Sequence, residues 1–214
     1  MRTVLVTLSG THGTGKSTNA GKCYYLLNKQ GLRFSYLRHQ DLLDPLGFIL
    51  RRAARILRFK DTTDFERLEP VRVLSSAYYL FIYLPFLAGG IKIRELLGYS
   101  TVADRYVYDL MAGSWGNGMN VPLEKLLLRI VPRPDVSFVF DADVKRILAD
   151  RPEHTFEYIV NEKAQYSKLV SVFGLRRIST DDPPDAVWNS ILHDIEAAFS
   201  QREHGRRPYL GARH

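Results

Sequence analysis

The sequence predicts an α/β fold built on a parallel β-sheet, and three observations support this prediction. Short apolar runs that suit strands alternate with longer segments of helical pattern, which is typical of βαβ units. A glycine-rich segment at residues 10–17 joins the first apolar run to the first helical segment. The chain has 214 residues, 45% of them hydrophobic and 25% charged, which suits one folded domain. We therefore expect a single domain over residues 1–200 and a basic C-terminal tail over 201–214.

The elements of the first half follow from apolar runs and helix-end signals. Residues 3–9 (TVLVTLS) form an apolar run that suits a buried strand. Gly31 suits the C-terminal cap of the helix that follows, because glycine readily takes the left-handed backbone there. The predicted elements are, in order, a strand at 3–9, a helix at 16–30, a strand at 33–38, a helix at 46–59 and a long helix from about residue 65.

The second half repeats the alternation. Segments at 100–103 and 136–140 predict further strands, and 175–179 is a fifth candidate, which brings the expected sheet to five strands. The segments that separate and follow the last two strands predict helices at about 157–173 and 185–199. Residues 201–214 have no such pattern and are expected to be a loose tail.

Residues 73–91 contain no charged side chain, a length that approaches that of a membrane span. The run nevertheless holds Ser75, Ser76 and Pro85, and it ends near Gly89 and Gly90. Proline is expected to kink a helix and the glycine pair to end it. We interpret the run as a buried helix that also serves a subunit interface, and we expect no membrane span.

Gly10-Thr-His-Gly-Thr-Gly15-Lys16-Ser17 matches the pattern G-x-x-x-x-G-K-[ST] between a strand and a helix start. Its glycines let backbone N–H groups point at phosphate oxygens, and the helix N-terminus adds partial positive charge. Lys16 suits the β- and γ-phosphates, Ser17 a magnesium ion and Thr18 the α-phosphate. The pattern predicts binding of ATP and Mg²⁺. The predicted nucleotide contacts are Gly10, Thr11, His12, Gly13, Thr14, Gly15, Lys16, Ser17 and Thr18.

Asp104-Arg105-Tyr106 follows the third predicted strand. Ligands of open α/β sheets gather beyond the carboxyl ends of the strands, so these side chains are expected to face the phosphate site. Phosphoryl transfer needs a carboxylate for Mg²⁺ and a cation for the phosphoryl group, and Asp104 and Arg105 supply one of each. A surface ion pair is the alternative interpretation.

Further arginines lie where an acceptor or a lid would need a cation. Arg38 ends the second strand on the same sheet edge and suits an anionic acceptor, or it is simply solvated. Arg72 begins the uncharged run and is a candidate for the acceptor, with an ion pair to Glu69 as the alternative. Arg151 lies in a polar turn after the fourth strand, in a segment that suits a short lid. Lys16, Asp104, Arg105 and Arg151 are the predicted catalytic residues.

The ordered series of motifs resembles the thymidylate kinase family over residues 3–199. It comprises the glycine-rich loop, Arg38, Arg72, Asp104-Arg105-Tyr106, residues 133–141 (RPDVSFVFD) before the lid, and Ile178-Ser-Thr-Asp near the end. The resemblance implies the P-loop NTPase fold with a five-stranded parallel sheet, a homodimer packed through the long helices, and transfer of the ATP γ-phosphate to dTMP. It implies that Arg38 and Arg105 contact the acceptor phosphate, that Arg72 contacts thymine and that Tyr106 belongs to the acceptor side. It also implies that Asp104 serves the Mg²⁺ site and that Arg151 is the lid arginine.

The chain departs from the family pattern at several positions. His12 stands where the family commonly has a P-loop carboxylate, and Ser9 where it commonly has a glutamate. Asp109 replaces the usual serine after Asp-Arg-Tyr, and the segment after Arg38 reads His39-Gln40-Asp41. These changes concern the acceptor more than ATP, so a kinase for a deoxynucleoside or another small monophosphate is the first alternative.

Charge and cysteine content bear on partners and location. The net charge of +7 includes a cluster at Arg51, Arg52, Arg55, Arg58 and Lys60. Such a cluster suits a nucleic-acid-associated P-loop ATPase, the second alternative, although no nucleic-acid-binding motif accompanies it. The single cysteine cannot form an internal disulfide, and the N-terminus lacks a secretion-signal pattern, so we expect a cytoplasmic protein.

Overall fold

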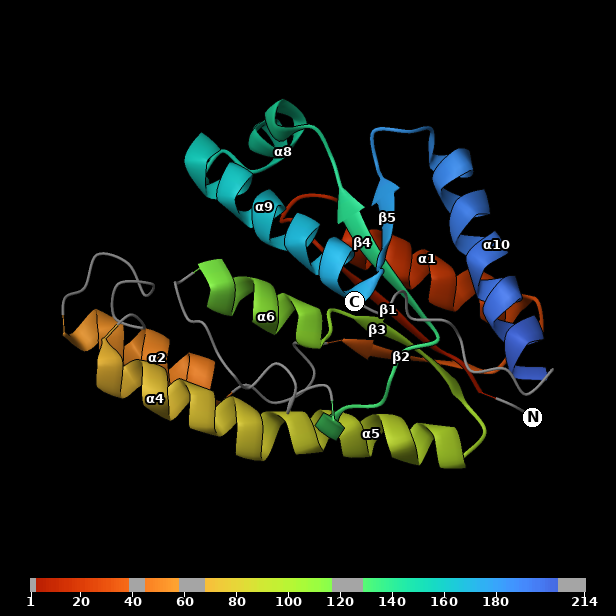
Figure 1. Cartoon of the computed structure of the whole chain (residues 1–214), viewed down its shortest axis with the longest axis horizontal. Coiled ribbons are helices and arrows are strands. Elements are labelled where there is room, and N and C mark those ends of the chain that lie inside the picture. Colours follow the sequence, from red (N-terminus) through yellow and green to blue (C-terminus); the bar gives the residue numbers. More distant parts are fainter. Residues whose placement is uncertain (1–2, 39–44, 58–67, 117–128, 204–214) are drawn as a thin grey trace.

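The computed structural model describes residues 3–38, 45–57, 68–116 and 129–203, which form a parallel β-sheet between two layers of helices (Figure 1). The sheet has five strands in the order β2-β3-β1-β4-β5, and every neighbouring pair is parallel. The predicted α/β class is therefore confirmed. The strands are β1 (Leu5–Gly10), β2 (Phe34–Arg38), β3 (Ser100–Asp104), β4 (Val136–Asp141) and β5 (Arg176–Ser179).

The register of the strands brings their carboxyl ends to one edge of the sheet. Asp104 of β3 pairs with Leu8 of β1 and with Arg38 of β2, while Gly10 of β1 pairs with Phe140 of β4. β1 is central, with neighbours on both sides, and all of its residues are buried. This explains its continuous apolar sequence, because a central parallel strand is covered on both faces.

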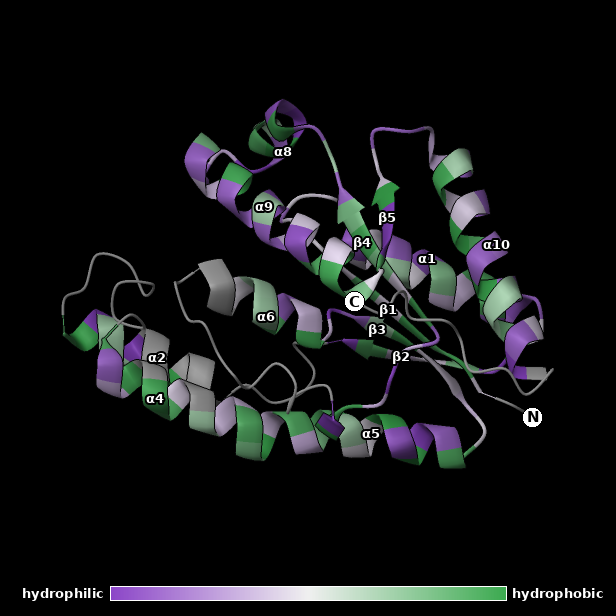
Figure 2. Ribbon diagram, viewed as in Figure 1, coloured by the Kyte–Doolittle hydropathy of each residue, from purple (hydrophilic) through white to green (hydrophobic). Residues whose placement is uncertain are grey.

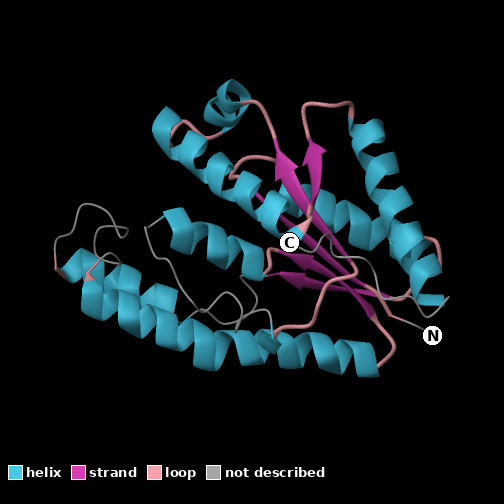
Figure 3. Cartoon of the chain, viewed as in Figure 1, coloured by secondary structure: helices cyan, strands magenta, loops and turns pink. Residues whose placement is uncertain are grey.

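Helices cover both faces of the sheet (Figure 3). One apolar core joins the sheet to α1 and α10, and a second joins it to α5, α6 and α9. The sequence prediction did not include α6. The helices are α1 (Lys16–Lys29), α2 (Pro45–Ile56), α4 (Glu69–Tyr78), α5 (Leu84–Leu96), α6 (Val107–Gly116), α8 (Val144–Asp150), α9 (Phe156–Phe173) and α10 (Pro184–Glu203).

The uncharged run forms most of one long helical segment, in which a π-helical turn, η2 (Tyr79–Tyr83), connects α4 and α5. The N–H of Leu84 donates to the carbonyl of Tyr79, five residues back, just before Pro85. The wider turn accommodates the proline, which has no N–H to donate. The prediction that Gly89 and Gly90 end the helix is wrong, since α5 continues to Leu96. Each glycine costs only about 1 kcal/mol inside a helix, which packing against the sheet can offset.

Only one face of this long segment is buried, so the prediction of a buried helix holds for that face alone. Leu84, Leu87 and Ile91 pack into the core, whereas Phe86 is 67% and Leu96 77% exposed. Figure 2 shows apolar residues along much of its length. By length and composition alone the 28 residues Glu69–Leu96 meet the criterion for a membrane-crossing helix, with 19% of the most apolar window buried. Core helices of soluble proteins can meet the same criterion.

The last helix is longer than the sequence suggests. α10 continues to Glu203, so residues 201–203 are helical and not part of a loose tail. Arg202 donates through Nε and Nη2 to the Asp135 carboxylate, which also accepts the N–H of Leu5. The helix therefore extends because its last turn is bonded to the sheet. Residues 204–214, and Phe65 at the predicted start of the long helix, lie outside the described residues.

Candidate active site

The glycine-rich loop lies between the end of β1 and the start of α1, as its sequence predicts. Gly10, Gly13 and Gly15 have φ angles of 137°, 76° and 73°, in the region that favours glycine. A Cβ atom on Gly10 would lie 2.2 Å from the carbonyl oxygen of Phe140 in β4. Glycine is thus required at position 10 by the neighbouring strand as well as by the backbone angle.

Lys16 is held inside this loop. Its side chain is only 5% exposed, and Nζ donates to the carbonyl oxygen of Thr11 at 2.7 Å. The Thr14 hydroxyl donates to the same carbonyl at 2.8 Å. Burial lowers the pKa of Lys16 to about 8, even though the nearby carboxylate of Asp109 acts to raise it. The ammonium group is therefore poorly hydrated, and its attraction to a bound anion is stronger than it would be in bulk water.

The first turn of α1 suits phosphate binding. It contains no acidic residue, and Gly15 caps it with a left-handed backbone. Ser17 and Thr18, predicted to contact Mg²⁺ and phosphate, are both exposed there. Free N–H groups and the helix dipole at such a terminus attract anions.

Asp104 ends β3 beside the loop and is 2% exposed. Its Oδ2 accepts a hydrogen bond from the Tyr36 hydroxyl at 2.9 Å, whereas Oδ1 is buried with no hydrogen-bond partner among the described residues. A buried carboxylate oxygen without a partner is costly, and a cation ligand would satisfy it. The donor set of Asp104 and the exposed Ser17 hydroxyl therefore fits Mg²⁺, which is usually held by one or two protein oxygens with water and phosphate. The described residues contain no cluster of three or more His, Cys, Asp or Glu side chains suited to a metal.

Arg105 has an unusual backbone. Its φ angle is 74°, and among the described residues it alone is a non-glycine residue with positive φ. Its N–H donates to the carbonyl of Leu8 in β1, and its charge acts to lower the pKa of Lys16. Arg105 and Asp104 both contribute to the electrostatic environment of Lys16, so the structure brings these three predicted residues together.

The other acceptor-side predictions are placed less closely. Arg38 is exposed at the end of β2, in register with Asp104. Arg72 lies in α4, and its side chain is outside the described part of the structure. Tyr106 is 2% exposed in the core, and its hydroxyl donates to the carbonyl of Pro132. Packing accounts for Tyr106 in this structure, and its contact with a substrate stays a prediction.

The predicted lid segment, which comprises α8 and the turn that contains Arg151, lies directly against the glycine-rich loop. A Cβ atom on Gly13 would be 3.2 Å from Cγ of Arg151 and 3.4 Å from Cγ2 of Ile147. Arg151 follows α8, and its exposed guanidinium lies 3.6 Å from the Glu153 carboxylate. The stem of Arg151 is thus beside the loop, while its guanidinium is exposed to solvent.

Two carboxylates make contacts at or directly before the loop that the sequence did not predict. Asp109 of α6 accepts a hydrogen bond from the hydroxyl of Ser9, and Glu162 of α9 contacts His12. Ser9 and Asp109 are 100 residues apart in the chain, and His12 and Glu162 are 150 apart. No local sequence signal pairs such residues.

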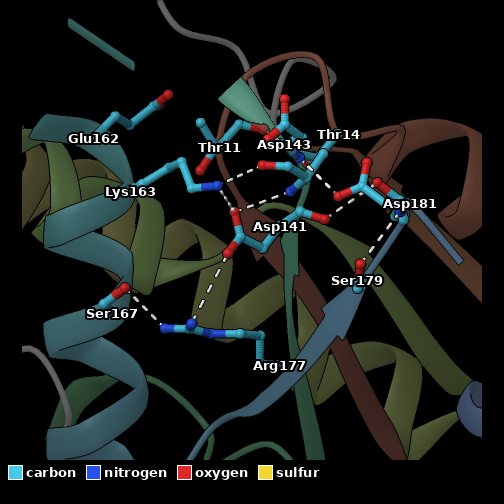
Figure 4. A network of polar contacts seen from close by, with 12 residues as sticks. Thr11, Thr14, Asp141, Asp143, Glu162, Lys163, Ser167, Arg177, Ser179 and Asp181 are labelled. Atoms are coloured by element: carbon cyan, nitrogen blue, oxygen red, sulfur yellow. Dashed lines mark hydrogen bonds and ion pairs between the residues drawn. The ribbon is translucent and has the colours of Figure 1, made fainter. Parts of the chain in front are cut away.

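A further polar network lies at the end of β4 (Figure 4). Lys163 of α9 lies 2.9 Å from Oδ1 of Asp141, and Arg177 of β5 approaches Oδ2 at 3.9 Å. Next to it, Asp181 accepts from the N–H of Asp143 and from Arg146 of α8. These contacts connect the lid segment to the loop after β5.

Comparison with known proteins gives one informative similarity. No protein-family model matches the chain. A protein of Thermococcus kodakarensis named probable thymidylate kinase is 23% identical over 207 residues, which span 92% of this chain and 100% of that protein. The similarity therefore spans most of the chain and is not confined to the glycine-rich loop.

Proposed function

We propose that this protein is a nucleoside monophosphate kinase that transfers the γ-phosphate of ATP to dTMP. The observation that carries the proposal is the position of the buried Lys16 beside an acid and a guanidinium, Asp104 and Arg105. This combination supplies what phosphoryl transfer needs, namely a phosphate cradle, a metal ligand and a cation near the transferring group. The full-length similarity to the archaeal protein named probable thymidylate kinase supports the same conclusion.

In this proposal the loop binds ATP. Backbone N–H groups of residues 13–18 and the Lys16 ammonium contact the phosphates, while Asp104 Oδ1 and the Ser17 hydroxyl hold Mg²⁺. The ion would neutralise charge on the phosphate oxygens. Tyr36 donates to the other carboxylate oxygen of Asp104, which keeps in place the oxygen that would hold Mg²⁺.

The acceptor lies on the side of β2 and β3. Arg105 and Arg38 are assigned to its phosphate, and Arg72 to its base. An acceptor that already carries a phosphate makes use of both guanidinium groups, whereas a nucleoside leaves them without an anion. Arg151 is assigned to the transferring phosphoryl group, and the segment before it excludes water that would hydrolyse ATP.

The assay that tests the proposal offers Mg²⁺-ATP with a panel of nucleosides and nucleoside monophosphates, and it measures ADP and phosphorylated product. We expect product with dTMP or dUMP, and we expect Lys16→Ala to abolish it. Arg105→Ala should reduce turnover with monophosphates far more than it weakens binding of ATP.

Three outcomes decide between this proposal and the alternatives. Product with nucleosides but not with monophosphates would assign a nucleoside kinase. Hydrolysis of ATP that rises on addition of DNA or RNA and falls steeply with salt would assign a nucleic-acid-associated ATPase. Equal ADP formation with and without every acceptor would reject the kinase proposal.

We also propose that a second copy of the chain covers the exposed apolar face of α4–α5, in a cytoplasmic protein that does not enter a membrane. Ile82, Phe86 and Ile93 are exposed apolar residues at helical spacing, with exposed Phe81 beside them, and nearby Gly89 and Gly90 allow close approach of another helix. A twofold contact would bury this stripe against itself.

Light scattering coupled to gel filtration tests the assembly. The wild-type protein is expected at twice the chain mass of 24.6 kDa, and Phe86→Glu at the monomer mass. A wild-type monomer that sediments with phospholipid vesicles would instead assign this face to a membrane surface.

A further inference from the structure

Asp109 has three hydrogen-bond donors around its carboxylate. Oδ2 accepts from the Ser9 hydroxyl at 2.6 Å and from the N–H of Tyr106 at 2.9 Å, and Oδ1 accepts from the Tyr166 hydroxyl at 2.8 Å. These donors come from β1, from the turn after β3 and from α9. One carboxylate thus joins the start of the glycine-rich loop, the Arg105 turn and the helix that follows the lid segment.

Glu162 holds the middle of the same loop. Its Oε2 accepts the backbone N–H of His12 at 3.1 Å, and its Oε1 lies 2.6 Å from Nδ1 of the His12 ring. The Glu162 side chain is 13% exposed, so this two-point contact is largely shielded from water. Charge-assisted hydrogen bonds of this kind fix both distance and orientation.

We propose that Asp109 and Glu162 are positioning residues for the nucleotide phosphates, and that they supply from α6 and α9 the carboxylates that the loop itself lacks. Residues 9–18 contain no Asp or Glu. Asp109 bonds to Ser9, the residue of β1 directly before the loop, and Glu162 bonds to His12 within the loop. The inference rests on ATP binding at the loop, which is one part of the proposed function, and is independent of the identity of the acceptor.

Both carboxylates also act on the Lys16 ammonium. Burial has the largest effect on the pKa of Lys16 and lowers it, while Asp109 exerts the strongest opposing influence and Glu162 a further one. The pKa of Glu162 is itself lowered, because the hydrogen bond and charge of His12, together with Lys16, outweigh the effect of burial. The two acids and Lys16 therefore form one electrostatic unit.

Ser9 and Asp109 are the two sides of a single 2.6 Å hydrogen bond, in which Asp109 supplies the acid and Ser9 the hydroxyl. In the contact at His12, Glu162 supplies the acid.

A purely structural role is the competing explanation for Asp109. It occupies the third position of α6 and accepts the N–H of Tyr106 before the helix, which is half of a capping box. A cap contributes to the stability of α6 but makes no prediction about which side of the Ser9 contact must carry the acid. An exchange experiment therefore separates the two roles.

The experiment compares Ser9→Asp, Asp109→Ser and the double variant, which contains the same atoms as the wild type with the two side chains exchanged. Affinity is measured by titration with a fluorescent N-methylanthraniloyl ATP and Mg²⁺. Each single variant is expected to bind about tenfold more weakly, the equivalent of one charged hydrogen bond. The double variant is expected to recover to within about threefold of wild type.

Failure of the exchange to restore affinity would overturn the positioning role of Asp109, provided that circular dichroism shows the double variant to be folded. If the double variant does not fold, Asp109→Asn provides the test, since it keeps the size of the side chain, removes its charge and replaces one acceptor oxygen with a donor. Wild-type affinity in a folded Asp109→Asn would equally reject the proposal.

Glu162→Gln tests the second carboxylate, with Glu196→Gln on the exposed face of α10 as the matched loss of one charge. We expect Glu162→Gln to weaken ATP binding about tenfold, because the His12 contact loses its charge, and Glu196→Gln to leave it unchanged. Equal affinities for the two variants would reject the role of Glu162. Lys16→Ala serves as the reference for lost ATP binding. If the wild-type protein binds ATP but does not phosphorylate dTMP, only the proposed acceptor is rejected.

Discussion

Lys16 and Arg105 are both held in states that cost folding free energy. Lys16 loses most of its hydration, and Arg105 adopts a left-handed backbone that disfavours side chains. Such costs are common where a fold prearranges a site for charge. Each gives a measurable consequence at the level of one residue.

The activity should depend on the proton of Lys16. Burial lowers the pKa of Lys16 to about 8, so the side chain is charged below pH 8 and progressively neutral above it. Because kcat/KM reports the free enzyme, kcat/KM for ATP is expected to be level near pH 7 and to fall as pH rises through about 8. A profile that stays level to pH 9.5 would contradict this assignment.

The backbone at Arg105 can be tested separately from its side chain. Arg105→Ala and Arg105→Gly both remove the guanidinium, but only glycine relieves the left-handed strain at φ 74°. Urea unfolding should show Arg105→Gly to be about 1 kcal/mol more stable than Arg105→Ala. Both variants are expected to lose kinase activity. Equal stabilities would show that the turn carries no strain.

Residue types in the loop could be predicted from sequence, whereas their partners could not. The spacing of glycines, Lys16 and Ser17 is local, and it predicts the phosphate cradle directly. Asp109 and Glu162 acquire their positions from helix packing across 100 and 150 residues. Tyr36 likewise gains its contact with Asp104 only because β2 pairs with β3.

At the scale of elements, the close approach of β4 to the loop makes a side chain less acceptable at Gly10 than at any helix glycine whose surroundings the structure describes. Gly10→Ala would place a methyl group 2.2 Å from the Phe140 carbonyl oxygen, which requires the loop or β4 to move. A Cβ atom on Gly21 in α1 would meet no other described part of the chain within 4 Å. Gly21→Ala should therefore stabilise the protein by up to about 1 kcal/mol.

Thermal unfolding and ATP titration measure the difference between these variants. We expect Gly10→Ala to lower the melting temperature by more than 5 °C, equivalent to over 1 kcal/mol in a domain of this size, and to abolish ATP binding. Gly21→Ala should retain binding. Normal affinity in Gly10→Ala would mean that the strand contact is not needed for the loop.

Strands were easier to predict than the ends of helices. The five predicted strands agree with the observed ones to within two residues. The signal is strongest at the central strand β1, because a central parallel strand is covered on both faces. The sequence signals at Gly89 and Gly90 were misleading, because packing of Leu87 and Ile91 continues the helix past them. α10 also exceeds its prediction because of the Arg202 contact, which no local pattern indicates.

At the scale of the whole molecule, Asp135 connects both ends of the described chain. Its side chain is 1% exposed and bonds to Arg202 near the end of α10 and to the backbone of Leu5 in β1. Arg202→Met leaves this buried carboxylate without its cation and should destabilise the protein by about 3 kcal/mol. Arg176→Met breaks the exposed pair with Asp194 and should cost less than about 1 kcal/mol.

Chemical denaturation of the two arginine variants checks this expectation, since each loses one guanidinium from an ion pair. A cost at Arg202 no greater than that at Arg176 would show that Asp135 is satisfied without the C-terminal helix. The result would then place the boundary of the folded unit before α10 ends.

The central position of β1 has a consequence for biosynthesis. β1 is translated before the other strands, yet its neighbours β3 and β4 begin about 100 and 130 residues later, at Ser100 and Val136. Closing such long loops is entropically slow, so the nascent chain must carry an unpaired apolar segment until β3 and β4 have left the ribosome. During that interval β1 is exposed to aggregation, and chaperones that bind extended apolar peptides would find a target at Leu5–Gly10.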